Sequence, residues 1–266
     1  MQVPAGPMIR AYEPDAHAEP LPLVLFIHGG GWFAGNLDTE DRTCRMICNM
    51  LPASVISVGY RCDIDVPLEH EIEDCYTAFE WARSHAPDYG ADPDRIVVVG
   101  GSAGAALAAA VVHRLVQSGK GGEVAGLCSM NGLHLHPDAV PREYKHRSTS
   151  YVDNAGFLPF VSGHDTLQLY AERGIDTSQL DITIFPAAGG PDAVRGFPPT
   201  YIITSDNDAS RDDGTVFEAV LRDAGVIVKR DNVKGLAHYF WVFNLPKANA
   251  DFWSSICRGI SWTLGQ

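Results

Sequence analysis

The stretch RIVVVGGSAGAALAAA, residues 95–110, joins an apolar run to an alanine-rich run through a short glycine-rich turn. Near-continuous valine and isoleucine predict a strand that is buried on both faces, which is typical of parallel sheets. Alanine is the strongest helix former, so a helix is predicted from Ala103 onward. A strand that passes at once into a helix is the unit from which sheets covered by helices are built.

The same alternation of short apolar runs and amphipathic runs continues along the whole chain. The predicted strands are residues 8–14, 23–29, 54–60, 95–101, 124–132, 199–206 and 226–233. The predicted helices are residues 39–51, 70–86, 103–119 and 212–225, with a last helix from Pro246. Strands that alternate with helices predict an α/β fold, with a mostly parallel central sheet and helices on both faces.

One segment, from His136 to Pro199, interrupts this rhythm. It is too long for a connection within a compact domain, and long loops of this kind often form lids or binding elements. We therefore expect a single domain over residues 1–266, in which residues 137–198 form a cap that covers a site. A helix is expected near Val161 to Glu172 within this cap.

The composition limits the partners of the chain. A formal net charge of −13 argues against nucleic acid and anionic membranes, because both require clustered lysine and arginine. Six cysteines without a CxxC pair predict neither a disulfide framework nor a zinc knuckle. No signal-peptide core and no apolar window of membrane-spanning length is present. We expect a cytoplasmic protein that acts on a small molecule.

The turn GGSAG, residues 100–104, fits the pattern GxSxG between a strand and a helix. A serine on such a sharp turn holds its hydroxyl clear of the sheet, beside the positive end of the helix dipole. The alternative is that Ser102 only caps the helix, which is a common role for serine. The pattern alone leaves both interpretations open.

The stretch HGGGW, residues 28–32, lies where an earlier strand is expected to end. Acyl transfer develops a negative oxygen, and unshielded backbone N–H groups of glycines can stabilise it. We predict Gly30, Gly31 and Ala103 as these oxyanion donors. Phosphate binding is not indicated, because the chain has no GK[ST] and no complete GxGxxG.

A serine nucleophile needs a base, and the base needs an orienting acid. On folds of this kind these follow the serine in the order acid, then histidine, each after a later strand. The run GLAHYF, residues 235–240, offers His238 after the last predicted strand. The run DNDASRDDG offers Asp208, with Asp206 as its rival, while Asp212 and Asp213 are expected to favour the dipole of the next helix.

Together HGGGW, GGSAG, DNDASRDDG and GLAHYF resemble, in order and approximate spacing, the motifs of the hormone-sensitive-lipase-like branch of the α/β-hydrolases. This family consists of serine carboxylesterases and lipases, and the resemblance runs from about Ile9 to the C-terminus. It implies the α/β-hydrolase fold, with a cap insertion after the sixth strand of the fold. It also implies Ser102, Asp208 and His238 as the catalytic residues.

The resemblance decides between the two candidate acids. In that family the acid stands six residues before the glycine of a run like D-P-L-R-D-E-G. Counting back from Gly214 gives Asp208 rather than Asp206. The second and third glycines of HGGGW likewise match the family's oxyanion donors.

Two features depart from the family pattern. The family's turn usually reads GDSAG, whereas Gly101 stands here in place of the acid. The family's HGGGW also follows a longer N-terminal segment with lid helices, whereas here it begins at His28. The cap must then come mainly from the insertion, so the pocket is expected to be open or closed by a second copy in a homodimer.

Substrate contacts are predicted from aromatic and histidine residues near these motifs. The candidates are Trp32, His134, Phe157, Phe160 and Tyr239, with Phe240 as a further aromatic side chain. The stretch HLHPD, residues 134–138, resembles the start of a metal site, but no other ligand cluster accompanies it. No cofactor and no metal are predicted.

The motifs therefore predict a serine hydrolase that cleaves carboxylic esters of small or medium, largely apolar substrates through an acyl-enzyme. The same residues also suit lactone or amide hydrolysis, acyl transfer or elimination, because these reactions can share one intermediate. A ligand-binding relative without catalysis is a further alternative for this fold.

Overall fold

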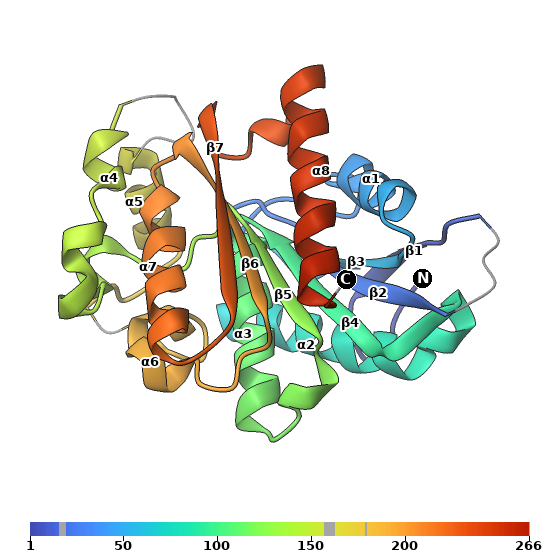
Figure 1. Cartoon of the computed structure of the whole chain (residues 1–266). Coiled ribbons are helices and arrows are strands. Elements are labelled where there is room, and N and C mark those ends of the chain that lie inside the picture. Colours follow the sequence, from blue (N-terminus) through green and yellow to red (C-terminus); the bar gives the residue numbers. More distant parts are fainter. Residues whose placement is uncertain (16–19, 157–162, 179, 266) are drawn as a thin grey trace.

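The computed structural model describes residues 1–15, 20–156, 163–178 and 180–265. Within these residues a seven-stranded sheet lies between two layers of helices (Figure 1). The strand order is β1-β3-β2-β4-β5-β6-β7, and every neighbouring pair is parallel except β1 with β3. The strands are β1 (Met8–Tyr12), β2 (Leu21–Ile27), β3 (Ser54–Gly59), β4 (Ala91–Gly101), β5 (Gly126–Met130), β6 (Thr200–Asn207) and β7 (Val228–Ala237).

The helices follow the predicted alternation with the strands. The α-helices are α1 (Asp41–Met50), α2 (Leu68–His85), α3 (Ala103–Gln117), α4 (Ser150–Asp153), α5 (Gly163–Glu172), α6 (Gly190–Ala193), α7 (Arg211–Asp223) and α8 (Pro246–Thr263). Short 3-10 helices are Ala86–Tyr89, Gly121–Glu123, Pro137–Ala139, Arg142–Arg147, Pro186–Gly189 and Phe240–Val242. All seven predicted strands are present, although β4 begins four residues earlier and β7 ends four residues later than expected. The predicted α/β architecture is confirmed.

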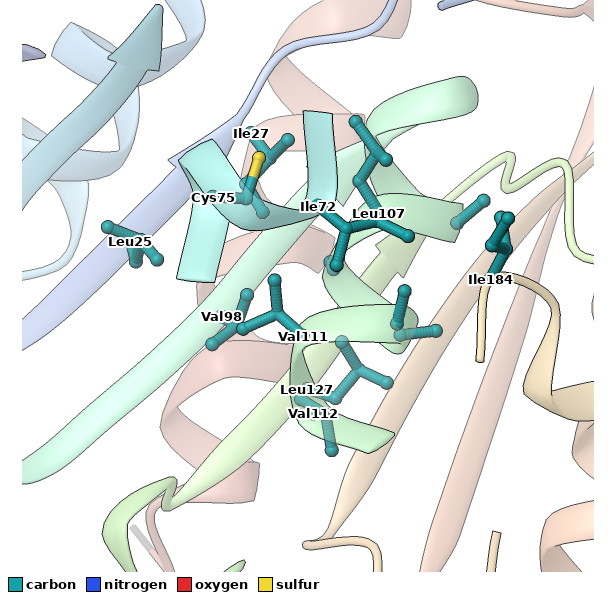
Figure 2. Packing of buried hydrophobic residues seen from close by; sticks show 14 of the residues in the cluster. Leu25, Ile27, Ile72, Cys75, Val98, Leu107, Val111, Val112, Leu127 and Ile184 are labelled. Carbon is teal, nitrogen blue, oxygen red and sulfur yellow. The ribbon is translucent and has the colours of Figure 1, made fainter. Parts of the chain in front are cut away.

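The sheet is buried on both faces, which explains why its central strands are almost entirely apolar. Alternate residues of β2 enter opposite cores: Leu25 and Ile27 pack toward α2 and α3, whereas Val24 and Phe26 pack toward α1 and α8. Figure 2 shows the first of these cores at close range. Each such side chain contributes about 1.5–3 kcal/mol by leaving water.

The cap lies between β5 and β6, and it contains α4, α5 and α6. It directly follows β5, the fifth of the seven strands described in this chain. Figure 1 shows these helices gathered near α7, at one side of the sheet. None of the helices in the described ranges is long and apolar enough to cross a lipid bilayer.

The first turn of α7 binds the cap through its acidic side chains. The Asp212 carboxylate accepts the backbone N–H groups of Thr149 and Ser150, both at 2.8 Å. The Asp213 carboxylate accepts the hydroxyl of Tyr151, on α4, at 3.3 Å. These two acids, expected only to favour the dipole of α7, thus have a second role in anchoring the cap.

Candidate active site

Four loops meet at the carboxyl edge of the sheet, where ligands bind in open α/β folds. Ser102 directly follows β4, Asp208 follows β6 and His238 follows β7. The loop HGGGW follows β2, which lies beside β4 in the sheet. Segments that are far apart in the sequence therefore converge because parallel neighbouring strands end at the same edge.

The serine turn is strained and closely packed. Ser102 has φ of 54°, in the left-handed region that side chains rarely adopt. A Cβ at Gly100 would lie 2.2 Å from the carbonyl oxygen of Gly104, and a Cβ at Gly104 would lie 2.3 Å from that of Ile27. Both glycines of GxSxG are therefore required by close backbone approach. The Ser102 N–H donates to Met130 O at 2.8 Å, which fixes the turn to the end of β5.

Three side chains from three loops form one hydrogen-bonded chain. Ser102 Oγ lies 2.7 Å from His238 Nε2, and His238 Nδ1 lies 2.9 Å from Asp208 Oδ2. The side chain of Asp208 is 1% exposed and that of His238 is 11% exposed. This chain has the geometry of a serine, a base and an orienting acid.

The rival acid is engaged elsewhere. The carboxylate of Asp206 accepts the side-chain amide of Asn232 and the backbone N–H of Gly235, at 2.5 and 3.3 Å. It also pairs with Lys234 at 3.3 Å. Asp206 thus binds the end of β7, while Asp208 faces the imidazole.

Two residues that sequence analysis missed hold Asp208 in place. Asn131 Nδ2 donates to Asp208 Oδ2 at 2.6 Å. Ser210 donates to Asp208 Oδ1 through its N–H at 2.8 Å and its hydroxyl at 2.9 Å. Asn131 is the last but one residue of the predicted strand 124–132 and directly follows β5, so the rule that located the other strand-end residues also applies to it.

The HGGGW loop exposes its backbone to the same site. Gly30 and Gly31 have φ of 131° and 66°, and a Cβ at Gly30 would lie 1.9 Å from Ala34 O. Both glycines border one cavity together with Ser102. Ala103 opens α3, so its N–H has no partner within the helix. The two glycines thus line the same cavity as Ser102, and Ala103 directly follows the serine in the chain.

The cavity above the serine has a volume of about 460 Å³, which is within the usual range for small-molecule sites. One wall belongs to the cap, because α5 supplies a row of side chains to it. The lining residues are Gly30, Gly31, Phe33, Ala34, Ser102, Leu133, Asp165, Thr166, Gln168, Leu169, Glu172, His238 and Tyr239. The surface combines apolar side chains with polar ones from α5.

A family model for the α/β-hydrolase fold matches residues 24–242. The chain belongs to the α/β-hydrolase family. This hydrolase is 33% identical over 263 residues to a versiconal hemiacetal acetate esterase of Dothistroma septosporum, covering 98% of this chain and 79% of the relative. It is 32% identical over 241 residues to carboxylesterase NlhH of Mycobacterium tuberculosis, covering 89% and 72%.

A solved structure of an esterase from Pyrobaculum calidifontis has the same architecture, with a TM-score of 0.84 and 26% identity, covering 96% of this chain and 80% of that one. These similarities show that the protein is a carboxylic ester hydrolase. It is a serine esterase of the hormone-sensitive-lipase-like type. The alternatives of lactone or amide hydrolysis, acyl transfer, elimination and ligand binding alone are not favoured.

The candidate substrate contacts of the hydrolase have different surroundings. Tyr239 lines the cavity, whereas Phe157 and Phe160 lie outside the described residues. Trp32 is fully buried and packs against rings of the cap, with centroids 5.5 Å from Tyr170 and 5.9 Å from Phe185. It therefore joins the HGGGW loop to the cap and is not among the lining residues.

His134 is also in the core rather than on the cavity surface. It is 2% exposed, and its Nε2 lies 2.7 Å from Ser129 Oγ. Its ring contacts Phe217, and burial lowers its pKa from 6.5 to about 3.

Phe240, the further aromatic candidate, is buried at 2% exposure. Among the described residues no cluster of three or more metal-binding side chains occurs.

Proposed function

We propose that Ser102 is the nucleophile of this esterase, His238 its general base and Asp208 the acid that orients the imidazole. The observation that carries the proposal is the chain from Ser102 Oγ to His238 Nε2 at 2.7 Å and from His238 Nδ1 to Asp208 Oδ2 at 2.9 Å. Its serine end opens into the cavity.

In the proposed reaction His238 takes the hydroxyl proton as Ser102 Oγ attacks the ester carbonyl carbon. The N–H groups of Gly30, Gly31 and Ala103 stabilise the oxyanion that forms. Collapse of this intermediate transfers the proton from His238 to the leaving alcohol and leaves an acyl-enzyme. Water then attacks the acyl carbon with the help of His238, releasing the carboxylic acid and restoring the serine.

We propose substrates with small or medium, largely apolar groups. The cavity of about 460 Å³ and its contacts with Phe33, Leu133 and Leu169 support this size and polarity. The fungal relative named as an acetate esterase supports a short acyl group as the starting point of a series. Residues 137–198 act in this proposal as a cap that helps to select the substrate.

The decisive experiment compares the wild-type protein with Ser102→Ala. General base catalysis contributes about 10²–10⁴-fold and each oxyanion donor about 10²–10³-fold, so the variant is expected to lose essentially all turnover of a chromogenic acetate ester. Its thermal midpoint is expected to stay close to that of the wild type. An organophosphonate adduct found by mass spectrometry on Ser102 would support the assignment, and undiminished cleavage by Ser102→Ala would refute it.

We further propose that the esterase is a homodimer. In its support, β7 lies at an edge of the sheet and Ile227 beside it is 67% exposed. Exposed edge strands readily pair with a second chain. Sedimentation equilibrium at micromolar concentration tests this, and a purely monomeric distribution would contradict it.

The cytoplasm is the proposed location. All six cysteines are free thiols, and five of them are buried. Unpaired cysteines are typical of proteins in reducing compartments. Cell fractionation with an antibody against the protein tests this, and recovery from an oxidising compartment would contradict it.

A further inference from the structure

A buried carboxyl group lies behind the serine turn and has no role in the proposed reaction. It belongs to Glu40, which directly precedes α1 and is 1% exposed. Its partners are neutral donors: the Tyr239 hydroxyl, Trp241 Nε1 at 3.1 Å and Thr43 Oγ1 at 2.7 Å. Burial raises the pKa of Glu40, and these donors oppose the shift.

Glu40 occupies space that a side chain at position 101 would need. Gly100 and Gly104 are closed to side chains by backbone atoms at 2.2–2.3 Å. By contrast, the three atoms nearest to a Cβ at Gly101 all belong to side chains: Glu40 Oε1 and Trp241 Cζ2 at 3.2 Å and Met130 Cε at 3.3 Å. Position 101 is thus closed by its neighbours' side chains and not by the backbone of the turn.

The carboxyl group also connects the loops on either side of the serine turn. The Tyr239 hydroxyl donates to Glu40 and accepts the backbone N–H of Gly29 at 3.0 Å. Tyr239 directly follows His238, and Gly29 directly precedes the predicted oxyanion donor Gly30. A Cβ at Gly29 would lie 2.8 Å from Gly101 O, so the HGGGW loop also touches the serine turn.

We propose that Glu40 is a positioning residue that supplies, from the start of α1, the carboxyl group that the family's GDSAG turn carries at position 101. Through Tyr239 it fixes the histidine loop against the HGGGW loop, beside the serine turn. The inference rests on the proposed function, because it assigns to Glu40 the alignment of the base and the oxyanion donors.

The expected effect of Glu40→Ala follows from this alignment. Tyr239 and Trp241 lose their acceptor, so the histidine and oxyanion loops lose their common support. A misplacement of about 1 Å costs about 10²-fold in rate. We therefore expect kcat to fall ~10- to 100-fold and Ser102 labelling by the organophosphonate to slow in parallel, with KM changed by less than about threefold.

Moving the acid tests the inference more sharply than deleting it. Gly101→Asp alone is expected to lower activity and the thermal midpoint, because its carboxyl group meets that of Glu40. The double variant Glu40→Ala with Gly101→Asp is expected to regain at least about fivefold of the kcat lost in Glu40→Ala. Glu40→Gln keeps the volume and one acceptor oxygen, so its kcat is expected to lie between those of the wild type and Glu40→Ala.

The matched control is Asp41→Asn, which removes the neighbouring acid on the same helix. Asp41 binds Arg10 and Arg45 on the outer side of α1, at 3.1 and 2.7 Å. This variant is expected to keep its kcat and its labelling rate, even where its thermal midpoint falls.

The outcomes separate this inference from the proposed function. If wild-type Ser102 is not labelled, the proposed function fails. If it is labelled but Glu40→Ala and Glu40→Gln keep kcat and labelling within about twofold, the role of Glu40 is refuted. The role is likewise refuted if the double variant Glu40→Ala with Gly101→Asp regains none of the kcat lost in Glu40→Ala. It is also refuted if all Glu40 variants fail to fold, since the carboxyl group then serves stability alone.

Discussion

The floor and the roof of the active-site cavity are held in different ways. The floor is the set of loops at the strand ends, where backbone atoms pack against backbone atoms, as Gly100 does against Gly104. The roof is the cap, which is attached by carboxylates of α7 that accept hydrogen bonds from it and by a guanidinium of its own that binds α2. If the proposed function holds, the reaction is expected to depend on contacts that tolerate little change, and the selection of substrate on a few separable polar contacts.

A buried ion pair attaches the cap to α2 as well. Arg173, just after α5, donates to Glu71 Oε1 on α2 at 2.7 Å, and the two side chains are 1% and 0% exposed. The same guanidinium donates to the carbonyl oxygens of Asp63, Ile64 and Val66 at 2.6–2.7 Å. Because α5 forms a wall of the cavity, this contact fixes the wall relative to the floor.

The largest expected effect is on the floor. Asp208→Asn is expected to reduce kcat about 10⁴-fold, because an amide cannot hold the imidazole in the required tautomer. The matched control is Asp206→Asn, which removes an acid that binds Asn232 and Gly235 instead. Turnover of an acetate ester, with thermal midpoints, measures both variants. A greater loss in Asp206→Asn than in Asp208→Asn would reverse the assignment of the acid.

The next largest effect is expected at the roof. Arg173→Met leaves Glu71 buried without its cation and three carbonyl oxygens without a donor. Breaking a buried pair in this way costs about 3–5 kcal/mol of unfolding free energy. We expect KM to rise more than kcat falls, because the cavity wall loosens while the hydrogen-bonded chain at Ser102 stays intact.

The control for this prediction is Arg173→Lys. An ammonium group keeps the charge but cannot match the fork of donors, so an intermediate stability is expected. Urea unfolding and esterase kinetics measure both variants. Unchanged stability and KM in Arg173→Met would show that the cap is held by other contacts.

The same contrast explains what the sequence could predict. Ser102, its flanking glycines and the HGGGW loop are recognisable because strand ends and tight turns accept few residue types. Asp208 was separated from Asp206 only through the family resemblance, since both follow the same strand. Asn131 carried no motif of its own, so only its place at the end of a strand pointed to it.

The cap could not be predicted at this level. Arg173 gains its role from a partner about a hundred residues away, and no local pattern reports such a contact. The sequence also does not say which way an aromatic residue faces. Trp32 and His134 lie beside the motifs in the chain, yet both pack into the core because apolar burial outweighs exposure to the cavity.

An effect that is absent at neutral pH and grows in acid is expected at His134, just before the cap. Burial lowers the pKa of this histidine to about 3, against 6.5 in the unfolded chain. Between these values the unfolded state binds a proton that the folded state does not, so stability is complete above pH 6.5 and is lost as the pH falls toward 3. Each pH unit in this window costs about 1.4 kcal/mol.

His134→Gln removes this titration and tests the prediction. Burial also lowers the pKa of His28, His113 and His136, so the informative quantity is the difference between variant and wild type. Urea unfolding at pH 7, 5.5 and 4.5 is expected to give a shallower loss of stability in the variant. Parallel slopes would show that His134 does not limit acid stability.

The smallest expected effect concerns specificity alone. Leu169 on α5 lines the cavity, and its methyl groups lie 3.1–3.2 Å from where a Cβ at Gly31 would be. Leu169→Ala therefore enlarges the roof directly above a predicted oxyanion donor without touching the hydrogen-bonded chain. One methylene in an apolar pocket is worth about 1–3 kcal/mol, so the preference for longer acyl chains over acetate is expected to rise about 10-fold, with kcat for acetate little changed.

Leu167→Ala is the matched control, because Leu167 is on the same helix but not among the lining residues. Equal shifts in both variants would mean that the helix as a whole, and not the side chain at 169, sets the acyl preference.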